Sequence, residues 1–272
     1  MTITSKDNEK LKLVRKLAER KHREREGLFV TEGEDLLEAG RNAGHEPTTL
    51  LTREGEGLGG DEVAAELLDT VSQLGSGTRV IAAWPIPDHE RPTPSAIAHD
   101  AGRSSQASPR ERPTRSAIAH DVGRSPLEEG AVCVYLHGVG DPGNVGSIVR
   151  SAGALADAWV ALGPECADPY GPKAVRASMG AIFSVAISRR DIAETPTPRV
   201  SLVAHGGSAA PPANAETICL GAERDGLPPE IIDATDATWT IQMRPDAVES
   251  LGVAAAAAIA LSRIGSRVGE SG

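Results

Sequence analysis

The sequence predicts an α/β protein in which a small α/β domain precedes a larger domain built around a parallel sheet. Three observations support this fold class. Short apolar runs alternate with helical patterns along both halves of the chain. The runs after residue 131 lack alternating polar positions, which is typical of strands buried on both faces of a sheet. A Pro-, Ser- and Arg-rich stretch separates the halves, so we place the domains at 1–85 and 128–266, with a flexible linker at 86–127.

The first domain begins with an amphipathic helix. LKLVRKLAERKH places Leu11, Val14 and Leu17 on one face, with basic side chains around the rest. Within GLFVTEGEDLLEAG the pattern predicts a short strand, a turn at Glu32 and Gly33, and a helix that ends at Gly40. The remaining elements are a strand at 48–52, a helix around DEVAAELLDTV and a strand at 78–84.

The linker contains an internal duplication. RPTPSAIAHDAGRS (91–104) recurs as RPTRSAIAHDVGRS (112–125), an offset of 21 residues. Two copies are too few for a repeat architecture, and each has little to bury. We therefore interpret the equivalent His99 and His120 as duplicated linker residues rather than as a metal-binding or catalytic pair.

The second domain alternates strands and helices from its start. The expected strands are 131–136, 158–163, 183–187, 200–205, 217–221 and 238–243. The expected helices are 144–156, one within 168–181, and an Ala-rich helix from about residue 250.

Composition limits the class of protein. Hydrophobic residues make up 40% of the chain and aromatic residues only 3%, which predicts an aliphatic core. We find no apolar run long enough for a membrane span and no secretory signal, so we expect a cytoplasmic protein without a membrane partner. The three cysteines lie far apart without CxxC spacing, which predicts reduced thiols and no metal site.

The charge distribution favours nucleic-acid binding near the N-terminus, although the net charge is −10. Basic residues outnumber acidic ones in residues 1–30, and a local basic face can hold phosphates. A solvated amphipathic helix is the other interpretation. The candidate phosphate contacts are Arg15, Lys16, Arg20, Lys21 and Arg23.

Three segments read as a strand end, a turn and a helix start, where backbone N–H groups are available to a nucleotide-like ligand. They are DPGNVGSIVRSAGA (141–154), LGAERDGLPPEI (220–231) and IQMRPDAVESLGVAAAAAIAL (241–261). In the first, Asn144 and Arg150 are under two helical turns apart and can serve the same end of the sheet. Alternatively, Asn144 is a helix N-cap and Arg150 a surface residue. GVGDPG also fits GxGxxG, with Glu165 as the acid of a dinucleotide site, but a lone match is weak.

The order and amino-acid sequences of these segments resemble motifs 1, 2 and 3 of the SpoU/TrmH family of RNA ribose methyltransferases, in the SPOUT superfamily. The N-terminal segment resembles the L30e-like substrate-binding domain that precedes many of these methyltransferases; its sequence is SKDNEKLKLVRKLAERKHREREGLFVTEGEDLL. The resemblance implies a SPOUT-type sheet with a deep trefoil knot, S-adenosyl-L-methionine as cofactor, and a homodimer with its sites near the interface. It also implies that RNA is the partner.

The resemblance assigns roles residue by residue. It implies catalysis by Arg150, aided by Asn144, Glu223 and Ser250. The methyl donor would be held around Gly221, Gly226, Ile241, Met243 and Leu251. Arg176, in an element common between motifs 1 and 2, would clamp RNA phosphate; its other interpretation is a helix C-terminal cap. The third motif departs from the family, with Gln242 for proline, Gly252 for asparagine and Ala254 for serine.

The implied reaction is methyl transfer to a ribose 2′-hydroxyl of structured RNA, with 23S rRNA preferred and tRNA as an alternative. Gly252 and Gln242 keep open a catalytically weakened relative that binds RNA without turnover. A dinucleotide-dependent oxidoreductase is the third hypothesis, but it leaves the second and third motifs unexplained.

Overall fold

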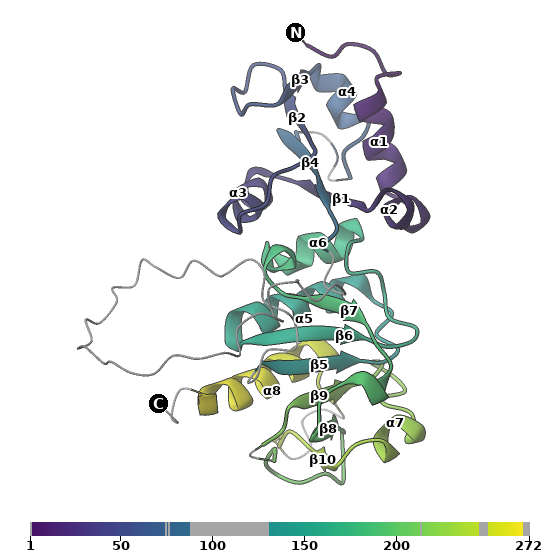
Figure 1. Ribbon diagram of the computed structural model, residues 1–272, viewed down its shortest axis with the longest axis vertical. Helices are drawn as coiled ribbons and strands as arrows, with labels where there is room; N and C mark the ends of the chain where they lie inside the picture. Colours follow the sequence, from purple (N-terminus) through teal and green to yellow (C-terminus); the bar gives the residue numbers. More distant parts are fainter. Residues whose placement is uncertain are drawn as a thin grey trace, which may run out of the picture.

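The computed structural model describes residues 2–73, 75, 77–87, 131–212, 214–244 and 250–268. Nearly all of the predicted linker at 86–127, including both copies of the duplication and both of its histidines, lies outside the described residues. The chain forms two sheets, the N-terminal one above the C-terminal one in Figure 1. Among the described helices, none has the length and apolar character needed to cross a membrane.

The N-terminal sheet has four strands in the order β1-β4-β2-β3. Strand β4 is antiparallel to β1 and β2, whereas β3 is parallel to β2. The elements, in chain order, are α1 (Glu9–Leu17), α2 (Arg20–Glu26), β1 (Leu28–Glu32), α3 (Glu34–Asn42), β2 (Thr49–Arg53), β3 (Asp61–Val63), α4 (Ala65–Asp69) and β4 (Val80–Pro85).

Two expectations for this half are wrong. The single N-terminal helix is divided into α1 and α2, because Arg23 folds back and donates to the carbonyls of Leu17 and Ala18 at the end of α1. The helix expected from residue 61 begins instead as β3, whose backbone pairs with β2, and becomes helical only at Ala65. Edge pairing therefore prevails over helix propensity there.

The C-terminal sheet is entirely parallel, in the order β10-β8-β9-β5-β6-β7, which confirms the predicted parallel sheet. Its elements are β5 (Val132–Leu136), α5 (Pro142–Leu155), β6 (Ala158–Leu162), α6 (Pro172–Ser178), β7 (Ile187–Arg189), β8 (Arg199–Leu202), β9 (Thr217–Leu220), α7 (Pro229–Asp233), β10 (Ala237–Trp239) and α8 (Val253–Val268). Since all strands run the same way, their carboxyl ends share one edge.

Two of the expected strands are placed differently. Residues 183–187 do not form a strand from the start; a 3-10 turn at Ala181–Phe183 comes first and β7 follows. Gly180, with φ +92°, lets the chain turn sharply there. The strand expected at 238–243 ends at Trp239, so the apolar residues beyond it are available for another surface.

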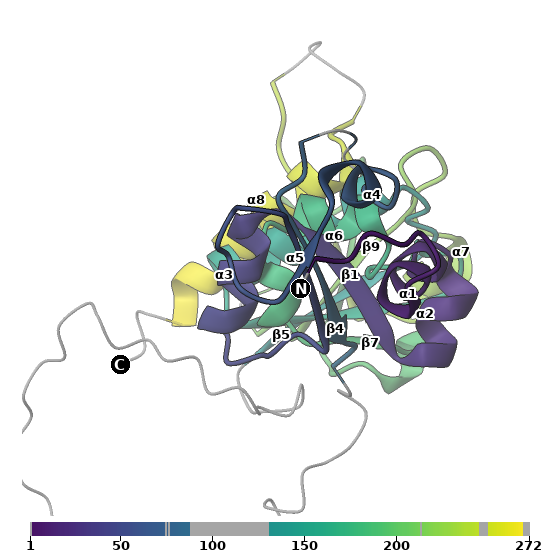
Figure 2. The same cartoon turned by 90° about the horizontal axis from the view of Figure 1, so that it is seen from above.

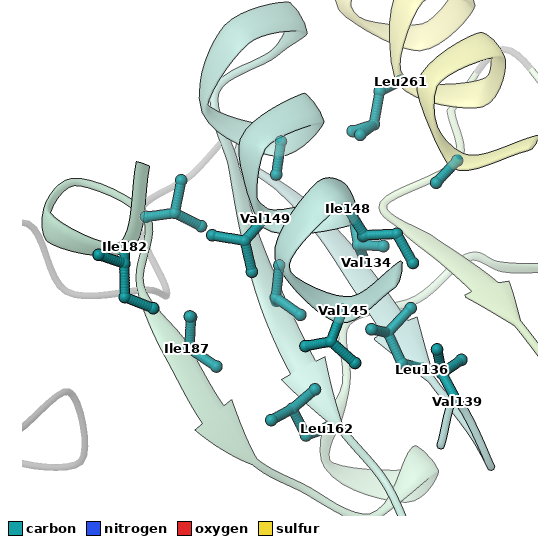
Figure 3. Close-up of a cluster of buried hydrophobic side chains, with 14 of the residues drawn as sticks. Val134, Leu136, Val139, Val145, Ile148, Val149, Leu162, Ile182, Ile187 and Leu261 are labelled. Carbon is teal, nitrogen blue, oxygen red and sulfur yellow. The ribbon is translucent and has the colours of Figure 1, made fainter. Parts of the chain in front are cut away.

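The core of this half lies between the sheet and helices α5 and α8. Figure 3 shows side chains of α5 directed at the strands, with Leu261 of α8 beside them. Fully buried examples are Val134, Leu136, Val145, Ile148 and Val149. Burial of each such side chain contributes roughly 1.5–3 kcal/mol. Gly146 lets α5 and α6 approach closely, because a Cβ there would lie 2.2 Å from the carbonyl oxygen of Ala174.

The opposite face of the sheet is covered by α7. Alternate residues of β5, β6 and β9 point to this side and pack with Leu227 and Ile231. All three cysteines of the chain are buried and free. Burial raises the pKa of Cys219 to about 12 and raises that of the other two thiols as well. The thiols are thus core residues.

The two halves share a continuous core. Phe29 of β1 lies 5.2 Å from Tyr170 between ring centroids, and Trp84 lies 4.8 Å from Phe183. Seen from above, the N-terminal sheet covers the part of the lower half that contains α6 (Figure 2). The N-terminal unit is therefore docked on the C-terminal one through apolar contact, in addition to the Arg23 interactions described below.

Candidate functional site

A cavity of about 360 Å³ lies at the carboxyl ends of β8, β9 and β10. Ligands of open parallel sheets bind at this edge, where the loops leave the strands. The cavity is lined by the segment after β8, by the loop from Leu220 to Leu227, and by Ile241, Met243 and residues 250–256 of the third motif and α8. Gly221, Gly226, Ile241, Met243 and Leu251 all contribute, so the structure brings the five predicted cofactor-binding residues together.

The loop after β9 is closed by its own backbone. Ala222 and Gly226 exchange two backbone hydrogen bonds, with N···O distances of 3.1 and 3.0 Å. Gly226 has φ +67°, the left-handed conformation that favours glycine. A Cβ on Gly221 would lie 2.1 Å from the carbonyl carbon of Gly226. Gly221 is therefore required by the close approach of the loop to itself.

Asn144 and Glu223 meet at the rim of this cavity. The Asn144 carboxamide donates a hydrogen bond to the Glu223 carboxylate, which joins the first and second motifs across 79 positions of sequence. Glu223 is also a lining residue. The interpretation of Asn144 as the N-cap of its helix is wrong, because Asp141 holds that position. The Asn144 side chain is therefore free to face the cavity rim.

Asp141 fixes the first turn of α5. One carboxylate oxygen accepts from the Asn144 backbone N–H at 3.0 Å, and the other accepts from the Lys173 ammonium at 2.6 Å. The Lys173 contact, followed by that backbone N–H, lowers the pKa of Asp141 below its ordinary value. Sequence reasoning gave neither residue a role. An Asp directly before Pro142 is nevertheless a recognisable helix-start signal.

The third motif supplies an apolar wall and a helix start. Ile241 is buried, Met243 and Leu251 are half-buried, and Ser250 is exposed at the cavity mouth. Gly252 precedes α8, and its carbonyl accepts the first hydrogen bond of that helix from Ala256. Among the described residues, no atom lies within 4 Å of a Cβ placed on Gly252, so these residues leave room there for a larger side chain.

Arg150 lies apart from the other predicted catalytic residues. It is exposed on α5 and does not line the cavity. Among the described residues it has no hydrogen bond or ion pair. A single chain therefore brings Asn144, Glu223 and Ser250 to one place but leaves Arg150 on an open helix surface.

The predicted phosphate contacts fall into two groups. Lys16 and Arg176 are exposed, the latter in the last turn of α6. Arg15, Arg20 and Lys21 are also exposed, and each contacts a neighbouring side chain or carbonyl at the surface. Weak surface pairs of this kind exchange readily for phosphate.

Arg23, which was predicted to contact RNA phosphate, lies instead in the interface between the two halves of the chain. It is buried, with only 4% of its surface exposed. Its guanidinium donates to one Asp168 carboxylate oxygen at 2.6 and 3.0 Å and to the α1 carbonyls at 2.7 and 2.8 Å. These partners satisfy its donors, so Arg23 is not available as an RNA contact in this structure.

Glu165 is exposed on the loop after β6. Gly138 and Gly140 of GVGDPG lie in the loop before α5, whereas Gly143 lies in the first turn of that helix, which starts at Pro142. Among the described residues, no group of three or more His, Cys, Asp or Glu side chains is placed to hold a metal ion.

Two family models match the chain. The SpoU rRNA Methylase family matches residues 131–262, and the MRM3-like substrate binding domain matches residues 8–82. The first match spans the parallel sheet and all three motifs. The second spans most of the N-terminal sheet.

Similar proteins align over almost the whole chain. A 23S rRNA (guanosine(2553)-2′-O)-methyltransferase of Bacillus subtilis is 26% identical over 94% of this chain and 96% of its own length. An uncharacterized tRNA/rRNA methyltransferase of Synechocystis is 25% identical over 96% of this chain and 92% of its own. The AdoMet-bound rRNA methyltransferase structure from Sinorhizobium meliloti has a TM-score of 0.72 at 25% identity and covers 97% of each chain. The motifs, the parallel sheet and these matches agree: residues 131–262 form a domain of the SpoU rRNA Methylase family.

Proposed function

We propose that this protein transfers a methyl group from S-adenosyl-L-methionine to a ribose 2′-hydroxyl of structured RNA, with 23S rRNA as the substrate. The observation that carries the proposal is the cavity at the carboxyl edge of the sheet, lined by motifs 2 and 3 and bordered by the Asn144–Glu223 pair. The Bacillus subtilis relative, named for methylation of a 23S rRNA ribose, supports the substrate class.

The residues of the cavity fit the cofactor. A volume of about 360 Å³ is within the usual range for small-molecule sites, which combine apolar walls with a few polar groups. Ile241, Met243 and Leu251 supply apolar surface for the adenosine part, and the tight loop at Gly221 and Gly226 supplies backbone groups. When bound, the cofactor supplies an electrophilic methyl group on a sulfonium centre. The related Sinorhizobium meliloti structure contains AdoMet.

The chain's own residues then act on the ribose. The 2′-oxygen bonds to the methyl carbon as the carbon–sulfur bond breaks, and the hydroxyl proton has to leave. A guanidinium does not deprotonate in proteins, so Arg150 stabilises the developing alkoxide, while an RNA phosphate accepts the proton. Asn144, Glu223 and Ser250 hold the ribose in line with the methyl group. This positioning lowers the barrier to methyl transfer.

The assembly of the whole protein belongs to the same proposal. The chain acts as a cytoplasmic homodimer with its sites near the dimer interface. The exposed Arg150, whose side chain has no hydrogen bond or ion pair among the described residues, supports a contribution across that interface. The domain at 128–266 contains a deep trefoil knot. The domain at 1–85 is L30e-like and selects RNA by shape and by phosphate contacts with Arg15, Lys16, Arg20 and Lys21. Arg176 of the second domain adds a further phosphate contact.

Gly252 motivates a second candidate, a relative that binds RNA and cofactor without efficient turnover. Glycine keeps its backbone N–H at the start of α8 but has no side-chain carbonyl to orient substrate. Because a Cβ at this position meets no atom of the described residues, Gly252→Asn is a suitable variant to make. A rise of tenfold or more in methyl transfer by Gly252→Asn would favour this candidate over the active enzyme.

The test is methyl transfer from labelled S-adenosyl-L-methionine to RNA that lacks ribose methylation. Unmodified 23S rRNA and unmodified tRNA are compared as acceptors, and cofactor binding is measured by calorimetry. We expect label in 23S rRNA only. Arg150→Ala should abolish transfer while RNA binding is retained. Full activity of Arg150→Ala would contradict the role proposed for Arg150. Label in tRNA would mean that the substrate is tRNA rather than 23S rRNA. Absence of cofactor binding would reject the proposal.

A further inference from the structure

A second cavity, of about 400 Å³, lies at the joint between the two halves of the chain. One side is formed by α2 and by the residues that follow β4. The other side is formed by the loop after β6 and by the end of β7. Ile86, Leu162, Pro169, Tyr170 and Ile187 give it an apolar floor. A volume of this size with a largely apolar floor is suited to a planar organic group rather than to an inorganic ion alone.

The rim of this cavity is positively charged. Glu24 pairs with Arg20 at 2.7 Å, and Asp168 pairs with the buried Arg23, so both acids of the lining are already neutralised. Arg189 is exposed at the last position of β7 and has no hydrogen bond or ion pair among the residues that the structure describes. It is therefore the cation of this lining that is left for an anionic ligand.

The cavity lies on the same edge of the sheet as the site proposed above. All six strands are parallel, and Figure 1 shows the arrowheads of β5, β6 and β7 at one edge with α2 above them. Asn144 lies in α5, eight residues beyond the end of β5, and Arg189 ends β7, two strands from β5. Neighbouring strands are separated by about 4.8 Å, so these two strand ends are roughly 10 Å apart. This spacing corresponds to a few nucleotides of an RNA chain.

We propose that this cavity holds an unpaired nucleotide of the substrate RNA, a few positions from the methylated ribose, with Arg189 contacting its phosphate. The proposal rests on the function proposed above and names how the RNA is held there. The base packs on the apolar floor, and the arginine at the rim binds the phosphate backbone. Proteins bind single-stranded RNA by this combination of contacts. A duplex keeps its bases stacked inside and cannot insert one into a concave site.

Arg189→Ala tests this proposal in the full-length chain, and Arg190→Ala is its matched control. Arg190 is the next residue, but its guanidinium is engaged by Ser188 and Glu194. Binding is measured over a salt series with two probes: an unmodified 23S rRNA transcript and a blunt RNA duplex without unpaired nucleotides. Cofactor affinity and methyl-transfer kinetics are measured on the same preparations.

Arg189→Ala is expected to weaken binding of the transcript about fivefold and to reduce the slope of log K against log salt by about 0.7, the value for one phosphate of a single strand. Arg189→Lys should restore the slope. Duplex binding and cofactor affinity should change less than twofold, and KM for RNA should rise with kcat unchanged. Arg190→Ala should match the wild type in every readout.

Equal effects of Arg189→Ala and Arg190→Ala on the transcript would overturn the proposal. So would an equal loss of duplex and transcript binding, because it would mean that the rim contacts a helical backbone. Failure of the proposed function has a different signature. A wild-type protein without methyl transfer would reject the enzyme, while the difference in RNA binding between the two arginine variants would still report on the cavity.

Discussion

Loss of the Asp168 carboxylate should destabilise the protein strongly, because it leaves Arg23 buried without its counter-charge. The Arg23 and Asp168 side chains are only 5% and 17% exposed. Removal of one partner from a buried pair costs about 3–5 kcal/mol. Arg23 keeps its two carbonyl acceptors in α1, so we expect the lower end, about 3 kcal/mol for Asp168→Ala. For a chain of this size that is a fall of about 6–12 °C in Tm.

The assay is urea and thermal unfolding of the full chain. Asp168→Asn keeps the size of the side chain and removes the charge, and should cost roughly 2 kcal/mol. Glu24→Ala is the control, since it removes an exposed pair with Arg20 on the same helix as Arg23, and should cost about 0.5 kcal/mol or less. A loss below 1 kcal/mol for Asp168→Ala would refute the reasoning, because the pair would then not secure the joint.

Three further outcomes are expected. Gly221→Ala should weaken cofactor binding about 30-fold by calorimetry, because its Cβ would force apart the two hydrogen bonds between Ala222 and Gly226, worth about 1 kcal/mol each. Asp141→Ala should cost about 1 kcal/mol by urea unfolding between pH 5 and 8. The pKa of Asp141 is lowered in the folded state, so this contribution is present above its ordinary value of 3.8 and is lost as pH falls below it. The three buried cysteines should resist alkylation at pH 8 in the native protein and react after denaturation.

Each of these has a control or a contrary outcome. Gly140→Ala has no atom within 4 Å of the new Cβ and should change cofactor affinity less than twofold. If Asp141→Ala loses the same free energy at pH 3 as at pH 7, its carboxylate is not the stabilising group. Rapid alkylation of the native protein would mean that the core around the thiols opens on the time scale of the reaction.

Much of the fold could be predicted from local patterns. The buried strands β5, β6 and β9 are uninterrupted apolar runs, and their parallel pairing follows from the helices between them. Strand ends were less predictable. After Trp239 apolar residues alternate with polar ones, a pattern typical of a strand, yet Ile241 and Met243 leave the sheet and line the cavity. Apolar character alone does not say whether a residue faces a strand or a ligand.

The residues of the site could be predicted only where they belong to a recognisable sequence motif. The cofactor-binding set lies together because its members follow β9 and β10, the two strands on either side of β8 in one parallel sheet. The contact between Asn144 and Glu223 spans 79 residues, and the pair of Arg23 with Asp168 spans 145. Pairings at such separations depend on tertiary packing, so a basic helix in the sequence could not reveal that one of its arginines is buried. A binding role for Arg189 could not be predicted from the sequence for the same reason, because the residues around it come from both halves of the chain.

The most direct test of the central claim is nucleoside mass spectrometry of 23S rRNA after reaction with the protein and isotopically labelled S-adenosyl-L-methionine. We predict a single labelled nucleoside with the methyl group on the ribose 2′-oxygen, absent from reactions with Arg150→Ala. A label on a base, or cofactor binding with no labelled nucleoside in any RNA, would contradict the account.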